Sequence, residues 1–290
     1  SRGTCLLEHI NVSGCFLEEL PQAFTDGMQE LVNLHSKTGV ESAGEYLTQE
    51  EDRQVGLGIL GLANLLSLEG VTYSQFADAL EFNNHEQWEM MVTQPALNIV
   101  KALHKGINSA AAVAREANMD RAFAIAPTAS CSYRYTDRAG YTTTPEIAPP
   151  IGRNVDRDSS TFGVETFDYG NVETAEEVGF DVYKRVVDGI MEMINQTNLA
   201  HGYSYNTWSD VVTYTNEFIE EWLNSPQTSM YYSLQVMQNT QAKDDALAAL
   251  DGDFGTMFGF DEWDSKEMEA MDKEIADLFN GPDNCVGCAE

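Results

Sequence analysis

Apolar residues recur at helical spacing along much of the chain, and this period is the clearest structural signal in it. The run over residues 98–117 is typical: Ile99, Leu103 and Ile107 lie on one side, separated by polar and small residues. A glycine-containing apolar run at 53–67 also reads as a helix, in which Gly58 and Gly61 allow close packing. The pattern predicts helices over residues 16–36, 53–67, 76–80, 85–106, 98–117, 173–199, 209–223 and 265–279.

One short run, residues 122–126, is apolar without a polar break and predicts a strand buried on both faces. Pro127 ends it, because proline cannot donate a hydrogen bond to a sheet. The residues that follow are small and mostly hydroxylated: Thr128, Ala129, Ser130, Cys131 and Ser132. Hydroxyl and free N–H groups can cradle an anion, and α/β proteins bind ligands at the carboxyl ends of strands. The 127–132 loop is therefore either an anion-binding loop or an ordinary Ser/Thr turn.

Two further strands are predicted, one over residues 4–7 and one within 225–237. The prolines of 141–150 indicate a rigid extended segment, and 152–171 reads as irregular. Helices alternating with buried strands predict an α/β fold. Acidic and small residues dominate near the end, so we expect a main domain over 1–240 and a flexible acidic tail over 241–290.

Charge and cysteine content narrow the classes of function. The net charge of −31 disfavours nucleic-acid binding, which depends on Lys and Arg neutralising phosphates. Apolar runs are too short to span a bilayer, so no membrane partner is expected. Five cysteines are few and odd in number, which fits a reducing cytoplasm better than a secreted disulfide framework.

Cys285 and Cys288 lie close together near the end of the chain, behind Gly281 and Pro282. A cysteine pair on a mobile tail can exchange with another disulfide and then be reduced again. Half of a zinc site is the competing interpretation, although structural zinc needs four ligands. Inert cysteines are a third possibility.

Tyr231 and Tyr232 are adjacent on a predicted strand, so their rings should face opposite sides. Tyrosines in strands usually only pack, but a tyrosine pair beside other redox groups can relay an electron and a proton. The five histidines show no metal-binding spacing, and no phosphate-binding glycine signature is present, so no metal site is expected.

Together these segments resemble the C-terminal part of the large, catalytic alpha subunit of class I ribonucleotide reductases. The segment from Cys5 to Asn11 resembles the strand carrying one cysteine of the active-site redox pair. The 127–132 loop resembles the loop that holds the substrate diphosphate. Tyr231 and Tyr232 resemble the radical-relay pair, and the terminal cysteines resemble the tail dithiol that reduces the active site.

The resemblance implies a fold and a set of partners. We expect the C-terminal half of a ten-stranded α/β barrel with a flexible tail. Cys5, Tyr231, Tyr232, Cys285 and Cys288 would be catalytic, and Thr128, Ala129, Ser130, Cys131 and Ser132 would bind a ribonucleoside diphosphate. No cofactor would be bound directly: a metal-containing small (beta) subunit would supply the radical, and thioredoxin or glutaredoxin would be the reductant.

The family's radical-forming cysteine and its acid/base glutamate lie on a Cys-x-Glu strand that would precede the segment around Cys5. Cys5 and Glu8 have the wrong spacing for that role. We therefore expect this chain to act with an N-terminal part of the large subunit, as in a split or phage-like enzyme, and to be inactive alone. The alternative is a noncatalytic acidic scaffold or interaction protein.

Overall fold

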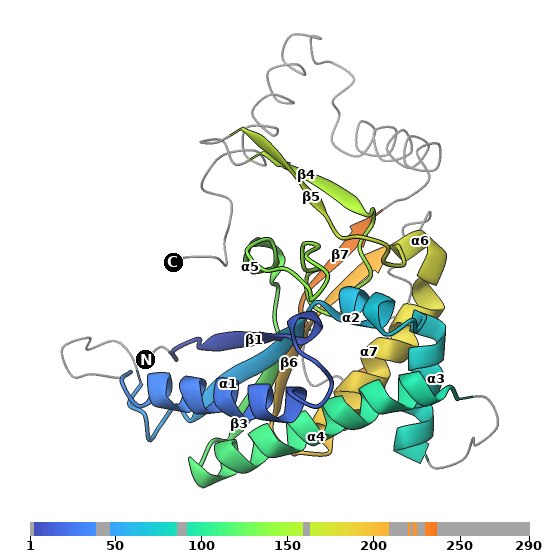
Figure 1. Ribbon diagram of the computed structural model, residues 1–290. Coiled ribbons are helices and arrows are strands. Elements are labelled where there is room, and N and C mark those ends of the chain that lie inside the picture. Colours follow the sequence, from blue (N-terminus) through green and yellow to red (C-terminus); the bar gives the residue numbers. More distant parts are fainter. Residues whose placement is uncertain are drawn as a thin grey trace, which may run out of the picture. The chain divides into compact units, whose positions relative to one another are not determined.

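The computed structural model describes residues 3–38, 47–85, 92–158, 163–208, 220, 223–224 and 230–236. Its centre is a sheet of five parallel strands in the order β1-β2-β3-β6-β7 (Figure 1). The strands are β1 (Leu7–Asn11), β2 (Gln54–Leu60), β3 (Arg121–Ile125), β6 (Ala200–Trp208) and β7 (Met230–Val236). Each new strand joins the same edge of the sheet, so right-handed crossovers place the connecting helices on one face.

The helices on that face account for most of the apolar core. They are α1 (Leu20–His35), α3 (Tyr73–His85), α4 (Gln94–Glu116) and α7 (Phe180–Asn195). Phe24 of α1, Ile190 of α7, and Leu57 and Phe123 of the sheet are all buried together there. The helix over 98–117 and the strand over 122–126 are thus confirmed, as is the helix over 16–36 apart from its first turn.

Smaller elements connect these layers. A single 3-10 turn (Val12–Gly14) follows β1, and helix α2 (Leu62–Leu68) follows β2. Beyond β3 come α5 (Ala129–Ser132), a hairpin of β4 (Asn154–Asp158) and β5 (Val164–Asp168), and α6 (Ala175–Val178).

The helix predicted over 53–67 is wrong, because its first half is strand β2. Val55, Leu57 and Ile59 alternate with glycines, which is the period of two that a strand requires. Gly61 then adopts a φ of +81°, and α2 begins directly after it.

Three other expectations need correction. Residues 152–171 are not irregular but contain the exposed β4–β5 hairpin. The helix over 173–199 is divided into α6 and α7 at Gly179, whose φ is +74°. Strand β6 was not predicted, because its polar and aromatic residues form no apolar run.

The predicted strand within 225–237 is present as β7. Strand β1 begins at Leu7, where the predicted 4–7 strand was expected to end. Most of the helix over 209–223, and all of 241–290 with the helix over 265–279, lie outside the described residues. The fold is mixed α/β, and the ten-stranded barrel stays a prediction.

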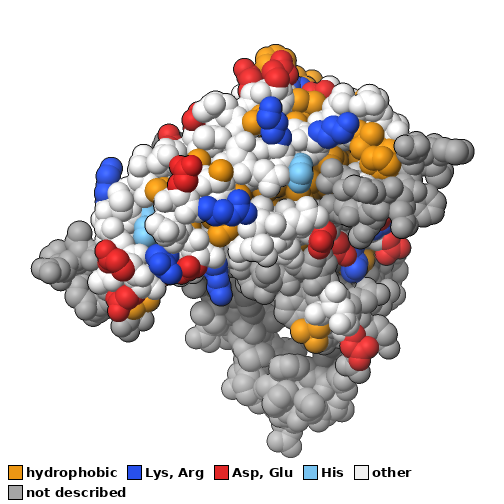
Figure 2. Space-filling model, turned by 90° about the horizontal axis from the view of Figure 1, so that it is seen from below, with side chains coloured by type: hydrophobic (Ala, Val, Ile, Leu, Met, Phe, Trp, Pro, Cys, Tyr) orange, Lys and Arg blue, Asp and Glu red, His pale blue; other side chains and the backbone are white. Residues whose placement is uncertain are grey.

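Figure 2 shows the side on which α1 and α4 lie, with Lys and Arg interspersed among Asp and Glu on its described part. That part carries no continuous basic surface. Within the described ranges, no helix combines the length and apolar character needed to cross a membrane.

Candidate functional site

The 127–132 loop lies at the carboxyl end of β3, between Ala126 and the end of the short helix α5. Thr128 is the residue before the first helical position, and the Ser132 N–H donates to its carbonyl oxygen at 2.8 Å. Ser130 and Cys131 are exposed, whereas Thr128 and Ser132 are buried. The first N–H groups of a helical turn have no partner within the helix. The loop therefore presents the backbone of 129–131 and the Ser130 side chain outward.

The hydroxyl groups of Thr128 and Ser132 are used inside the protein. Ser132 Oγ donates to the Ala129 carbonyl at 2.9 Å. Thr128 Oγ1 accepts the Glu146 N–H at 2.9 Å, and the Thr128 N–H donates to Glu146 Oε1 at 2.6 Å. This reciprocal pair fixes the start of the loop. Both hydroxyls thus have partners away from the exposed part of the loop.

Glu146 is 3% exposed and has a φ of +36°, a backbone conformation that side chains other than glycine rarely adopt. Burial raises the pKa of its carboxyl group to about 7, and the hydrogen bond from Thr128 opposes that rise. A buried carboxyl that titrates near neutrality therefore lies directly beneath the loop.

A second polar side chain reaches the loop from β1. The Ala126 N–H donates to His9 Nε2 at 3.0 Å, across the intervening strand β2. Burial lowers the pKa of His9 to about 4, so its imidazole is neutral at pH 7. The loop is thus anchored at both Ala126 and Thr128 by side chains distant in the sequence.

Residues 142–148 lie over the carboxyl ends of β2 and β3. The Gly61 N–H donates to the Thr144 carbonyl at 2.9 Å. Asn64 of α2 is buried. Its Oδ1 accepts a hydrogen bond from the Thr144 N–H at 2.7 Å, and its Nδ2 donates to Asp137 Oδ2 at 3.2 Å. These bonds hold the segment that carries Glu146 on the sheet, and bends over 145–148 interrupt the rigid extended segment that its prolines predict.

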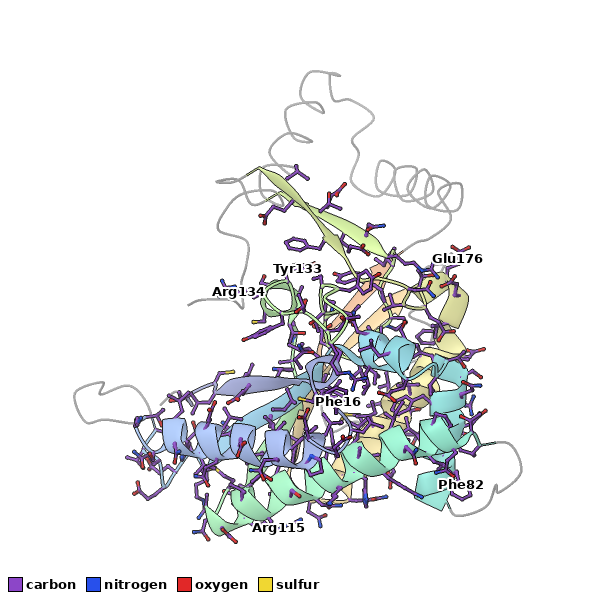
Figure 3. All side chains as sticks on the ribbon, in the orientation of Figure 1. Phe16, Phe82, Arg115, Tyr133, Arg134 and Glu176 are labelled. Atoms are coloured by element: carbon purple, nitrogen blue, oxygen red, sulfur yellow. The ribbon has the colours of Figure 1, made fainter. Side chains whose placement is uncertain are left out.

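The residues after α5 connect it to the β4–β5 hairpin. The ring of Tyr133 stacks on Phe167 of β5 with centroids 4.5 Å apart (Figure 3). Arg134 is exposed and forms no ion pair within the described part of the chain. It supplies a positive charge two residues beyond the end of the loop.

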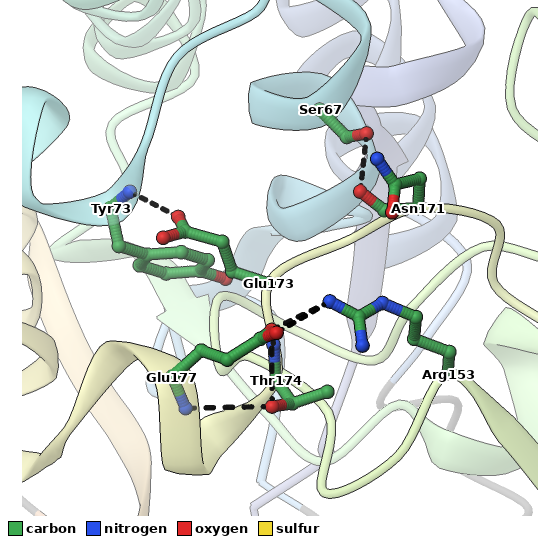
Figure 4. Close-up of polar contacts among 7 residues, drawn as sticks. All are labelled: Ser67, Tyr73, Arg153, Asn171, Glu173, Thr174 and Glu177. Carbon is green, nitrogen blue, oxygen red and sulfur yellow. Dashed lines mark hydrogen bonds and ion pairs between the residues drawn. The ribbon is translucent and has the colours of Figure 1, made fainter.

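Farther along, residues 171–177 form a strap across α2 and α3 (Figure 4). Ser67 Oγ donates to the Asn171 carbonyl at 2.9 Å, and the Tyr73 N–H donates to Glu173 Oε2 at 2.6 Å. Thr174 and Glu177 form a capping box at the start of α6, and Arg153 pairs with Glu177 at 2.7 Å. These contacts position the connection from the hairpin to α7.

Strand register sets the backbone of the tyrosine pair level with the start of the loop, two strands away. Ile125 of β3 is paired with Tyr203 of β6, and Tyr203 is paired with Met230 of β7. Tyr231 and Tyr232 therefore follow Met230 at the level where β3 passes into the loop. Two strand spacings of about 4.8 Å separate these backbones, roughly 10 Å in all.

The structure does not bring all predicted residues together. Cys5 is exposed and precedes β1, so it lies toward the amino end of the parallel sheet, whereas the loop lies at the carboxyl end. Cys285 and Cys288 lie outside the described residues. Among the described residues, no group of His, Cys, Asp and Glu is arranged to hold a metal ion.

His9, Glu146 and Arg134 were not predicted from the sequence. His9 stands inside the segment that carries Cys5, and Glu146 inside the proline-rich segment 141–150. No motif or spacing around either residue indicates that it would contact the 127–132 loop. Arg134 was detectable, as a basic residue two positions after the small-residue loop of a strongly acidic chain.

Comparison with known proteins finds similarity among solved structures. No family model matches the chain. No curated protein matches it either. The solved structure of the class Id ribonucleotide reductase alpha subunit from Actinobacillus ureae is similar, with 16% identical residues and a TM-score of 0.44. The similarity covers 80% of this chain and 49% of that subunit, so the chain spans about half of the subunit's length.

Proposed function

We propose that this chain is part of the catalytic alpha subunit of a ribonucleotide reductase and reduces ribonucleoside diphosphates by radical chemistry. The observation that supports the proposal is the register through β6, which sets the backbones of Tyr231 and Tyr232 level with the end of β3, two strands away from the start of the 127–132 loop. The radical chemistry would use the loop to hold the diphosphate and the tyrosine pair to relay the radical.

The loop would hold the diphosphate through the outward N–H groups of Ala129, Ser130 and Cys131 and the Ser130 hydroxyl. Arg134 would add a positive charge two residues beyond the loop in a strongly acidic chain. Thr128 and Ser132 would shape the loop from within instead of touching the ligand, because their hydroxyls already have partners.

Tyr231 and Tyr232 would pass a radical, as an electron and a proton, between a small subunit and a cysteine on an N-terminal part of the large subunit. Both residues belong to β7, which is separated from β3, the strand that leads into the loop, by β6 alone.

The reduction itself consumes two electrons. As the resemblance implies, Cys5 and a partner cysteine outside this chain would supply them, with the ribose extending from the diphosphate loop toward the end of β1 that Cys5 precedes. The ribose 2′ C–O bond breaks and a C2′–H bond forms, one thiol hydrogen goes to C2′ and the other leaves with the oxygen as water, and the two sulfurs join in a disulfide. Cys285 and Cys288 would exchange with that disulfide as thiolates and then be reduced by thioredoxin or glutaredoxin.

The test is reconstitution. The chain is mixed with an N-terminal part carrying the Cys-x-Glu strand and with a radical-generating small subunit, and deoxyribonucleotide formation is measured. We expect product only in the complete mixture, and we expect Tyr231→Phe or Tyr232→Phe to abolish turnover while diphosphate binding persists.

Normal turnover by either phenylalanine variant would refute the radical relay. No product and no complex with either subunit would refute the reductase function and favour a noncatalytic scaffold.

A further inference from the structure

His9 reaches the loop by crossing a neighbouring strand. It lies on β1, where its register partner is Gly58 of β2, and its ring extends over Gly58 to the backbone of β3. A Cβ built at Gly58 would lie 2.5 Å from His9 Nε2 and would also collide with the Ala124 carbonyl oxygen. The crossing is possible because position 58 has no side chain.

The contact at the far end is a specific one. The Ala126 N–H donates to Nε2, so this nitrogen carries the lone pair and the proton must lie on Nδ1. Ala126 is the last residue before Pro127, which has no N–H of its own. His9 therefore binds the final main-chain donor of β3 before the loop turns away from the sheet.

The surrounding groups favour a neutral ring. Adjacent residues of a strand face opposite sides, so Glu8 points to the helix-covered face, away from the ring of His9. Glu146, the other titratable group bonded to this region, contacts Thr128 and not Ala126. No carboxylate bonds to the imidazole among the described residues, and burial disfavours its charged form.

We propose that His9 is a positioning residue for the diphosphate: its neutral Nδ1–H tautomer holds Ala126, and thereby sets the direction in which the 127–132 loop leaves β3. The inference rests on the proposed function for the identity of the ligand, but the hydrogen bond and its effect on the loop can be measured without any ligand.

The first measurement is nuclear magnetic resonance on the uniformly ¹⁵N-labelled chain at pH 7. We expect a through-hydrogen-bond coupling between the Ala126 amide nitrogen and His9 Nε2, together with a protonated Nδ1. His9→Gln assigns the signals of this imidazole among the five histidines. An imidazolium, a protonated Nε2 or the absence of the coupling would overturn the inference.

The second measurement compares His9→Gln with His9→Phe. Glutamine keeps an acceptor, whereas phenylalanine fills the space without one. We expect the amide signals of 127–132 to shift in His9→Phe and to return close to wild type in His9→Gln. Unchanged loop signals in folded His9→Phe would also overturn the inference.

Inorganic pyrophosphate then links the loop to its ligand. Losing the acceptor of a buried N–H should weaken binding by about tenfold in His9→Phe, while His9→Gln stays close to wild type. Equal pyrophosphate binding by wild type and His9→Phe would refute the positioning role. Failure of the wild type to bind any pyrophosphate would instead refute the proposed diphosphate site. The coupling between the Ala126 amide nitrogen and His9 Nε2 would still show whether the hydrogen bond forms.

Discussion

The two faces of the parallel sheet are built from different residues. On the helix-covered face, Leu57, Ile59 and Phe123 are large and pack with α1, α4 and α7. On the other face, the same strands present Gly56, Gly58, Ala124 and the polar ring of His9. One face stabilises the fold through apolar burial, and the other leaves room for side chains and loops to meet.

This difference explains where the candidate site lies. Large side chains on both faces would bury the sheet completely, as in a sheet with helices on each side. Small residues on one face instead allow a histidine from β1 to reach β3. Large side chains thus pack the core on one face, and the candidate site lies where the other face carries small residues, so substitutions on the two faces should behave differently.

The largest effect is expected on the helix-covered face. Phe123→Ala removes a ring that is 2% exposed, and such deletions cost about 3–5 kcal/mol of unfolding free energy. Urea denaturation measures the loss, with half-exposed Leu34→Ala of α1 as the control that should change little. A loss in Phe123→Ala no greater than in the control would contradict the assigned core.

Gly58→Ala tests the other face of the sheet by adding a methyl group, whereas Phe123→Ala removes a ring. The new Cβ meets His9 Nε2 and the Ala124 carbonyl oxygen, and overpacking of this kind costs up to about 3 kcal/mol. Gly152→Ala is the matched control, because its Cβ would approach only the Asn154 carbonyl oxygen, at 3.4 Å. If both variants unfold at the same urea concentration, His9 and the Ala124 carbonyl do not lie as close to position 58 as described.

Glu146→Gln should change how stability depends on pH. The carboxyl of the folded protein has a pKa of about 7 against 4.5 for the unfolded chain, so the folded state binds more protons between these values. The resulting stability is complete below pH 4.5 and is lost as pH rises through 7. Between pH 5.5 and 8.5 the wild type should lose about 2 kcal/mol more than Glu146→Gln.

Urea denaturation at several pH values gives this difference directly. Burial and Glu30 also raise the pKa of Glu8 to about 7. That contribution is present in both proteins and cancels. Parallel pH profiles of wild type and Glu146→Gln would mean that Glu146 does not titrate in this range.

The smallest effect is expected away from both faces, at the strap. Thr174→Ala removes the hydroxyl of the capping box at α6, which should cost about 1 kcal/mol. Thr166→Ala on the exposed β4–β5 hairpin is the control. A Thr174→Ala loss as large as that of Phe123→Ala would show that the strap, and not the sheet core, limits stability.

The sequence predicted the parts of this fold that depend on local pattern. The period of α4 and the unbroken apolar strand β3 were both predicted correctly. Strand β2 was mistaken for a helix because its glycines hid an alternation of period two. The β4–β5 hairpin left no signal, because it buries almost none of its described side chains.

The site could be predicted only in part, for the same reason. The small-residue loop stands out in the sequence, but its anchors depend on long-range contacts. His9 and Ala126 are 117 positions apart, and Thr128 and Glu146 are 18 apart. The closeness of the tyrosine pair to the loop depends on two strand registers, which no local pattern specifies.

The proposed function depends first on the binding of a diphosphate by the 127–132 loop. The most direct measurement is a titration of the ¹⁵N-labelled chain with a ribonucleoside diphosphate, compared with the same nucleoside without phosphates, while backbone amide shifts are followed. We expect that the diphosphate alone moves the amide signals of Ala129, Ser130 and Cys131. Equal shifts with the unphosphorylated nucleoside, or shifts confined to other parts of the chain, would contradict it.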